Sequence, residues 1–183
     1  MKGIVFTELL EMVEERFSLD VVDRIVERAQ LPSGGVYTAV GTYPPAEAIA
    51  LVRELSAETG APPSALLHAF GMHLFKRFAV GFPHFFRPDD SALAFLERVE
   101  TVIHVEVKKL YPDAELPSFD CVREGGSLAM VYRSPRCLSP LAEGLIQGCA
   151  DHFGEPIEIA REDLSSSPGV EVVRFTITKR AAA

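Results

Sequence analysis

Apolar residues recur at the three- and four-residue spacing of amphipathic helices through the first two-thirds of the chain. Glycines and prolines interrupt this pattern at the points where helices would begin and end. We expect a helix that Asp20 caps, and further helices at residues 4–17, 45–59, 63–79 and 91–110. The last of these is predicted as one long helix, which Pro112 ends.

The last third of the chain changes to short runs rich in β-branched residues. Gly125-Gly126 joins two of these runs as a hairpin. The predicted elements are strands at 119–123, 128–132, 157–161 and 170–178, a helix at 138–153, and a Ser-rich loop ending in Pro168-Gly169. This order predicts an α+β fold in one domain, residues 1–183. A helical N-terminal lobe (about residues 1–60) precedes an α+β lobe (61–183) on a four-stranded antiparallel sheet.

Composition narrows the function classes. The 183 residues are 48% hydrophobic, enough to enclose a cofactor. A formal charge of −8 without basic clusters argues against nucleic-acid binding. The sequence has three cysteines without CxxC spacing, which indicates a reducing compartment. No apolar run in the sequence approaches the roughly 20 residues that span a bilayer. We therefore expect a soluble, cytoplasmic protein. The motifs of common hydrolases and nucleotide-binding enzymes are absent from the sequence, which disfavours an enzyme.

His104 is one of five histidines and lies in the middle of the predicted long helix. At helical spacing it shares a face with Thr101 and Val107, but also with Glu100 and Lys108. A lone histidine on such a mixed face is more often structural than a metal ligand. The pattern alone therefore makes His104 only a modest candidate, and we expect structural roles for the other four histidines.

A second candidate is the segment Tyr132-Arg133-Ser134-Pro135-Arg136. A phenol, a hydroxyl and a guanidinium alternate along an extended strand end, so they project to one side. Pro135 favours an extended conformation at Ser134. Three convergent donors form a suitable clamp for a carboxylate or a phosphate. The alternative is a solvated strand end in front of a helix, and the segment alone does not decide between the two.

These features, taken in order along the chain, resemble the H-NOX family of haem nitric oxide/oxygen binding domains, in its stand-alone bacterial form. The family includes the haem domain of soluble guanylate cyclase. The matching features are the Met1-Lys2-Gly3 start, His104 on a long helix, Pro117 after it, the motif of Tyr132, Ser134 and Arg136, and the run Gly144-Leu145-Ile146-Gln147-Gly148. Each is weak evidence alone, but the ordered set is specific.

The resemblance implies a haem b buried between the two lobes. It assigns His104 as the iron ligand, gives the propionates to Tyr132, Ser134 and Arg136, and places Pro117 against the porphyrin. Such a site also needs an apolar slot. The helical residues proposed to line it are Val5, Leu9, Leu74, Phe78, Leu141 and Leu145.

The resemblance also bears on which gas is bound. In oxygen-binding members a Tyr donates a hydrogen bond to the bound oxygen, supported by a Trp and an Asn. The matching positions here are Leu141, Leu9 and Leu74. An apolar distal pocket predicts a sensor that binds NO, binds CO more weakly and excludes oxygen. On this interpretation NO weakens the bond to His104, and the signal passes to a separate effector such as a histidine kinase or a diguanylate cyclase.

Three alternatives remain at this point: an oxygen-binding haem sensor, a haem-free module for a lipid or other hydrophobic small molecule, and a haem peroxide enzyme. The last is the weakest, because Leu74 and Leu141 occupy the positions that would need distal polar groups. Cys137, beside the clamp, is expected to be a small packing residue at a helix start, with a redox role as the alternative.

Overall fold

The computed structural model describes residues 1–165 and 169–180. Its helices are α1 (Gly3–Arg16), α2 (Leu19–Ala29), α3 (Pro45–Thr59), α4 (Pro63–Gly81), α5 (Ala92–Glu97), α6 (His104–Leu110) and α7 (Ser139–Phe153), with a 3₁₀ turn at Pro83–Phe85 and a π-helical segment at Val99–Ile103. Its strands are β1 (Ser118–Glu124), β2 (Ser127–Ser134), β3 (Ile157–Asp163) and β4 (Glu171–Lys179). The predicted α+β class is confirmed. The expected Ser-rich loop falls partly on residues 166–168, which lie outside the described residues.

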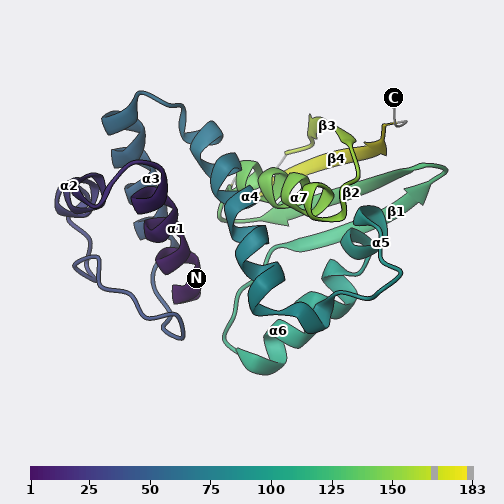
Figure 1. The fold of residues 1–183 in the computed structure, drawn as a ribbon, viewed down its shortest axis with the longest axis horizontal. Coiled ribbons are helices and arrows are strands. Elements are labelled where there is room, and N and C mark those ends of the chain that lie inside the picture. Colours follow the sequence, from purple (N-terminus) through teal and green to yellow (C-terminus); the bar gives the residue numbers. More distant parts are fainter. Residues whose placement is uncertain (166–168, 181–183) are drawn as a thin grey trace.

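The four strands form one antiparallel sheet in the order β1-β2-β4-β3 (Figure 1). The predicted hairpin is present, and Gly125 at its turn has a φ of 59°, which glycine adopts without strain. Alternate residues of the two central strands are buried and face the helices, as the two-residue period of a strand requires. The most buried of them are Leu128, Met130, Tyr132, Val173, Phe175 and Ile177.

The buried side chains form two apolar clusters that meet at α4. One cluster joins α1, α2 and α3 to the face of α4 that carries Phe70 and Leu74, with the partly buried Phe78 packed against it. The other includes Phe75, on a different face of α4, and joins it to α5, α7 and the sheet. Figure 1 shows α4 running between the N-terminal helices and the sheet lobe. The helix α4 therefore contributes side chains to both cores. The space beside its middle turns lies between the two lobes.

The helices α4 and α7 approach each other closely because glycines face one another where they cross. A Cβ atom at Gly144 would overlap the backbone carbonyl oxygen of His68, and a Cβ at Gly71 would overlap that of Leu141. Backbone therefore lies directly on backbone at this crossing. This contact sets the distance between α7 and α4. It therefore also sets the positions of the other side chains of α7 relative to α4.

The second helix begins differently from the prediction. Ser18, not Asp20, is its N-cap, and its hydroxyl accepts a hydrogen bond from the Val21 backbone N–H at 3.4 Å. Asp20 lies in the first turn, where a negative charge is favourable at the positive end of the helix dipole. The assignment of Asp20 as the cap was wrong because the serine two residues earlier takes that position.

The predicted continuous helix over residues 91–110 was also wrong. The structure divides it into α5, the π-helical segment Val99–Ile103 and α6. The Arg98 carbonyl accepts from both Val102 and Ile103, and the His104 N–H reaches back to Val99. Four of the five residues in the segment are β-branched, which crowds a regular α-turn. His104 is thus the first residue of α6, directly after a widened turn.

None of the helices among residues 1–165 and 169–180 has the length and apolar character needed to cross a membrane.

The crossing of α4 and α7 gives a first test. Gly144→Ala adds a methyl group against the His68 carbonyl, so the helices must separate, and we expect the free energy of unfolding to fall by about 1–3 kcal/mol. Urea denaturation followed by circular dichroism measures this change. Gly81→Ala is the matched control, because a Cβ there meets no described atom within 4 Å and alanine favours the helix. Equal losses in the two variants would contradict the close approach of the backbones.

Candidate functional site

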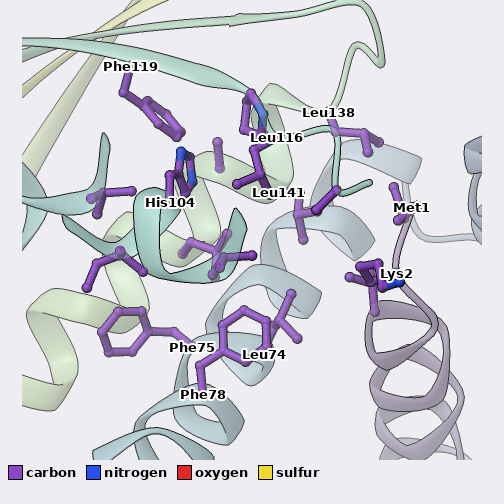
Figure 2. A pocket seen from close by; sticks show the side chains of 18 of the residues that line it. Met1, Lys2, Leu74, Phe75, Phe78, His104, Leu116, Phe119, Leu138 and Leu141 are labelled. Atoms are coloured by element: carbon purple, nitrogen blue, oxygen red, sulfur yellow. The ribbon is translucent and has the colours of Figure 1, made fainter. Parts of the chain in front are cut away.

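A cavity of about 330 Å³ lies between the two apolar clusters, within the size range of small-molecule sites. Its wall is formed by residues of α1, α4, α5, the π-helical segment, α6, α7, β1 and β2, and of the segment that joins α6 to β1. Figure 2 shows Leu74, Phe75 and Phe78 of α4 on one side of the pocket, with His104 and Phe119 across from them. The wall is mainly aliphatic and aromatic, with polar groups gathered at a few places. The cavity therefore suits a flat or bulky apolar group with a polar edge.

His104 is the histidine of this wall. Its side chain is 13% exposed, and its ring packs on Phe119 with the ring centres 5.7 Å apart. The Nδ1 atom lies 2.9 Å from the Oε2 atom of Glu100, one helical turn earlier. The same oxygen accepts the backbone N–H of Phe119 at 3.2 Å. Nε2, the other ring nitrogen, makes no hydrogen bond among the described residues and is available as a ligand atom.

Burial lowers the pKa of His104, and the hydrogen bond that its ring makes to the Glu100 carboxylate opposes this shift without reversing it. Removing the ring from water disfavours the charged imidazolium, since little solvent remains to stabilise it. The neutral ring is therefore the favoured form at neutral pH. Neutral imidazole is also the form that ligates a metal.

The three clamp residues Tyr132, Ser134 and Arg136 all contribute to the cavity wall. Tyr132 and Ser134 lie two apart in β2 and are both buried, as the alternation predicted. The Tyr132 hydroxyl accepts the Leu138 backbone N–H at 3.3 Å, and the Ser134 hydroxyl accepts the Arg136 backbone N–H at 3.1 Å. Burial raises the pKa of the Tyr132 phenol, so its O–H keeps its proton. The motif thus forms an ordered corner rather than a solvated strand end.

This corner is positively charged. The Arg136 guanidinium is 14% exposed and pairs at 2.9 Å with Glu115, whose carboxylate is 85% exposed. Burial, followed by the charge of Arg136, lowers the pKa of the amino group of Met1, which indicates that this cation lies nearby. Figure 2 places Met1 and Lys2 on the side of the pocket away from His104. A carboxylate entering the corner would exchange the exposed Glu115 for a partner in the cavity.

The side chains proposed for the apolar slot divide into two groups. Val5, Leu74, Phe78, Leu141 and Leu145 lie in the cavity wall, as does Pro117. Leu9 does not. It is 2% exposed and packs inside the N-terminal core. Helical periodicity placed Leu9 on the buried face of α1 but could not distinguish the core side of that face from the cavity side.

The segment between α6 and β1 is tied to the N-terminal lobe. Asp113 accepts a hydrogen bond from the Thr42 hydroxyl at 2.9 Å, and the Lys2 ammonium lies 3.5 Å from the same carboxylate. The Lys2 ammonium also lies 4.8 Å from the ring centre of Tyr111. A displacement of α6 would therefore alter the contacts that Asp113 and Tyr111 make with Lys2, near the start of the chain.

Sequence reasoning missed the role of Glu100 and treated it as evidence against His104. The i, i+4 spacing was the available signal, because a carboxylate one turn from a histidine can accept its ring N–H. Glu115 and Phe119 carried no such signal, since only the folded chain brings them to the wall. Cys137 is exposed and has a φ of 53°, so the expectation of a packing residue was wrong.

Comparisons with known proteins show the family of this chain. The sequence profile of the Haem-NO-binding family matches residues 2–161. An H-NOX protein from K. algicida, solved unliganded with Fe(II), is 37% identical over 100% of this chain and 98% of its own, with a TM-score of 0.92. An H-NOX protein from S. oneidensis, solved in the Fe(II)NO state, is 28% identical over 99% of this chain and 100% of its own, with a TM-score of 0.88. A search of curated protein sequences gives no significant match. The chain belongs to the haem-NO-binding (H-NOX) family of haem-binding gas-sensor domains.

Proposed function

We propose that this protein is a nitric oxide sensor that holds haem b in the cavity between its lobes. The observation that supports this most directly is the pairing of two unlike features in one apolar wall. One is a neutral imidazole, and the other is a corner of buried hydroxyl and guanidinium groups. A haem has the matching parts, since its iron takes an axial nitrogen ligand and its two carboxylates need donors.

The residues present fit this group. One imidazole is too little for a bare metal ion, whereas a porphyrin brings four nitrogen ligands of its own. His104 would supply the axial nitrogen, and Arg136, with Tyr132 and Ser134, would bind the propionates. Pro117 would lie against the ring. When bound, the haem supplies a ferrous iron that takes up a diatomic gas.

The choice of gas follows from the aliphatic part of the wall. Leu74, Leu141 and Leu145 contribute only carbon atoms through their side chains. Bound oxygen carries partial negative charge and needs a donor, whereas NO binds ferrous iron strongly without one. The NO-bound state of the S. oneidensis protein is in keeping with this choice. We therefore propose selection of NO over oxygen, with CO as a weaker ligand.

The proposed output begins at His104. Any change in its bond to the cofactor acts on the first residue of α6, directly after the π-helical turn. The contacts of Asp113 with Thr42 and Lys2 would carry a movement of α6 to the N-terminal lobe. We propose that a separate effector, such as a histidine kinase or a diguanylate cyclase, senses this rearrangement.

Removal of the imidazole tests haem binding. We expect the wild-type protein, expressed with a haem precursor, to show a Soret band. The affinity of His104→Ala for haem is expected to be at least about 10-fold lower, since even an outer-sphere partner contributes that much at metal sites. Absorption spectra and haem transfer to apomyoglobin measure this. His68→Ala is the control, because His68 lies on α4 and does not line the cavity.

A wild-type protein without a Soret band would overturn the proposal. It would favour instead a haem-free module for a hydrophobic small molecule, which a fluorescent fatty-acid probe would detect in the same cavity.

A donor introduced into the aliphatic wall tests gas selection. The ferrous wild-type protein is expected to show no stable spectral change with oxygen and a clear one with NO. Leu141→Tyr adds a phenol O–H, so we expect its affinity for oxygen to rise by about 10-fold, the effect of roughly one hydrogen bond of 1.4 kcal/mol. Leu141→Phe is the matched control, because it adds the ring without the hydroxyl. Stable oxygen binding by the wild type would indicate an oxygen sensor.

A further inference from the structure

Glu100 lies in the π-helical segment and contacts the side chain of His104, the first residue after that segment. Its Oε2 atom is 2.9 Å from Nδ1 of His104 and 3.2 Å from the backbone nitrogen of Phe119. One carboxylate oxygen thus joins the first residue of α6 to the second residue of β1. The imidazole also packs on the Phe119 ring. Two independent contacts therefore hold the ring between the helix and the strand.

These contacts determine which nitrogen carries the proton. An ionised carboxylate only accepts hydrogen bonds, so Nδ1 must be the donor. In a neutral ring Nε2 is then unprotonated and carries the lone pair. A neutral histidine side chain in water favours the Nε2-protonated tautomer, so the opposite selection here comes from Glu100. The His104 ring is thereby prepared as an Nε2 ligand before any metal arrives.

We infer that Glu100 is a positioning residue for His104, which fixes its tautomer and orientation and strengthens Nε2 as a donor to the haem iron. This inference rests on the proposed function. A negative acceptor on Nδ1 gives the ring partial imidazolate character, which strengthens the bond that the other nitrogen makes. Glu100 would thus set how firmly His104 is held, and how much binding energy a gas must supply to release it.

An ordinary surface ion pair would have no such effect. Exposed pairs at this spacing contribute only about 0.3–0.5 kcal/mol, and water replaces either partner readily. Glu100 is 37% exposed, but its histidine partner is 13% exposed, and its oxygen also serves a strand backbone. Removing the carboxylate would therefore leave a largely buried ring N–H and a backbone N–H without this acceptor.

The test compares two changes at Glu100. Glu100→Gln keeps an acceptor oxygen of the same reach and removes the charge, whereas Glu100→Leu removes the acceptor. In the haem-free protein, ¹⁵N NMR is expected to show Nδ1 of His104 protonated in the wild type, with a shift toward the Nε2-protonated tautomer in Glu100→Leu. In the ferrous haem protein, resonance Raman spectroscopy is expected to show an iron–histidine stretching frequency that falls from wild type to Glu100→Gln to Glu100→Leu. Haem dissociation is expected to accelerate by about 10–100-fold in Glu100→Leu.

Glu106→Gln is the matched control. It removes the same charge from α6, where Glu106 pairs with Lys109 at 2.6 Å, and we expect no change in either spectrum. If Glu100→Leu does not fold, Glu100→Gln retains the shape of the site and still tests the charge. An unchanged frequency in the Glu100 variants that bind haem, or an Nε2-protonated His104 in the wild type, would overturn the inference while leaving the Soret band intact. A wild type without a Soret band would overturn the proposed function, and the role of Glu100 toward haem with it.

Discussion

Burial of one imidazole beside an apolar cavity is the constraint on which the site depends. Burial lowers the pKa of His104, and the cavity wall around its ring is mainly aliphatic and aromatic. Such a ring is stable in the interior only if its remaining N–H is paired, and Glu100 provides that partner. The cavity therefore presents one free ring nitrogen in a mainly hydrocarbon setting, with its cationic corner at Arg136.

The cavity itself depends on how the two cores divide α4. Leu74 belongs to the N-terminal cluster and Phe75 to the sheet cluster, and both side chains also line the cavity. The glycines at the crossing of α4 and α7 bring backbone against backbone. Larger residues there would move α7 away from α4. This would displace Leu141 and Leu145, which form part of the cavity wall that has no hydrogen-bond donors. The size and the chemistry of the pocket are therefore set by the same contact.

His104 lies at the junction of the π-helical segment and α6. π-helical segments are less favourable than regular helix and often occur at functional sites. Here the Arg98 carbonyl accepts hydrogen bonds from the last two residues of the segment, and Glu100, its second residue, contacts β1. The far end of α6 leads to Asp113, which contacts Thr42 and Lys2 of the N-terminal lobe. His104 and the segment after α6 thus lie in contact with the sheet and with the N-terminal lobe, respectively.

The helices of the N-terminal half, the four strands and the corner formed by Tyr132, Ser134 and Arg136 can be predicted from the sequence, because they follow from local periodicity. Two-residue alternation in one strand is enough to place Tyr132 and Ser134 on one side. Local periodicity did not predict the break at Val99–Ile103, where β-branched crowding overrides helical periodicity, nor the place of Leu9 in the core. The role of Glu100 becomes evident only in the folded chain. Spacing puts it within reach of His104, but the folded strand β1 brings Phe119 to the same oxygen and buries the ring, which turns a surface pair into a support for the ligand.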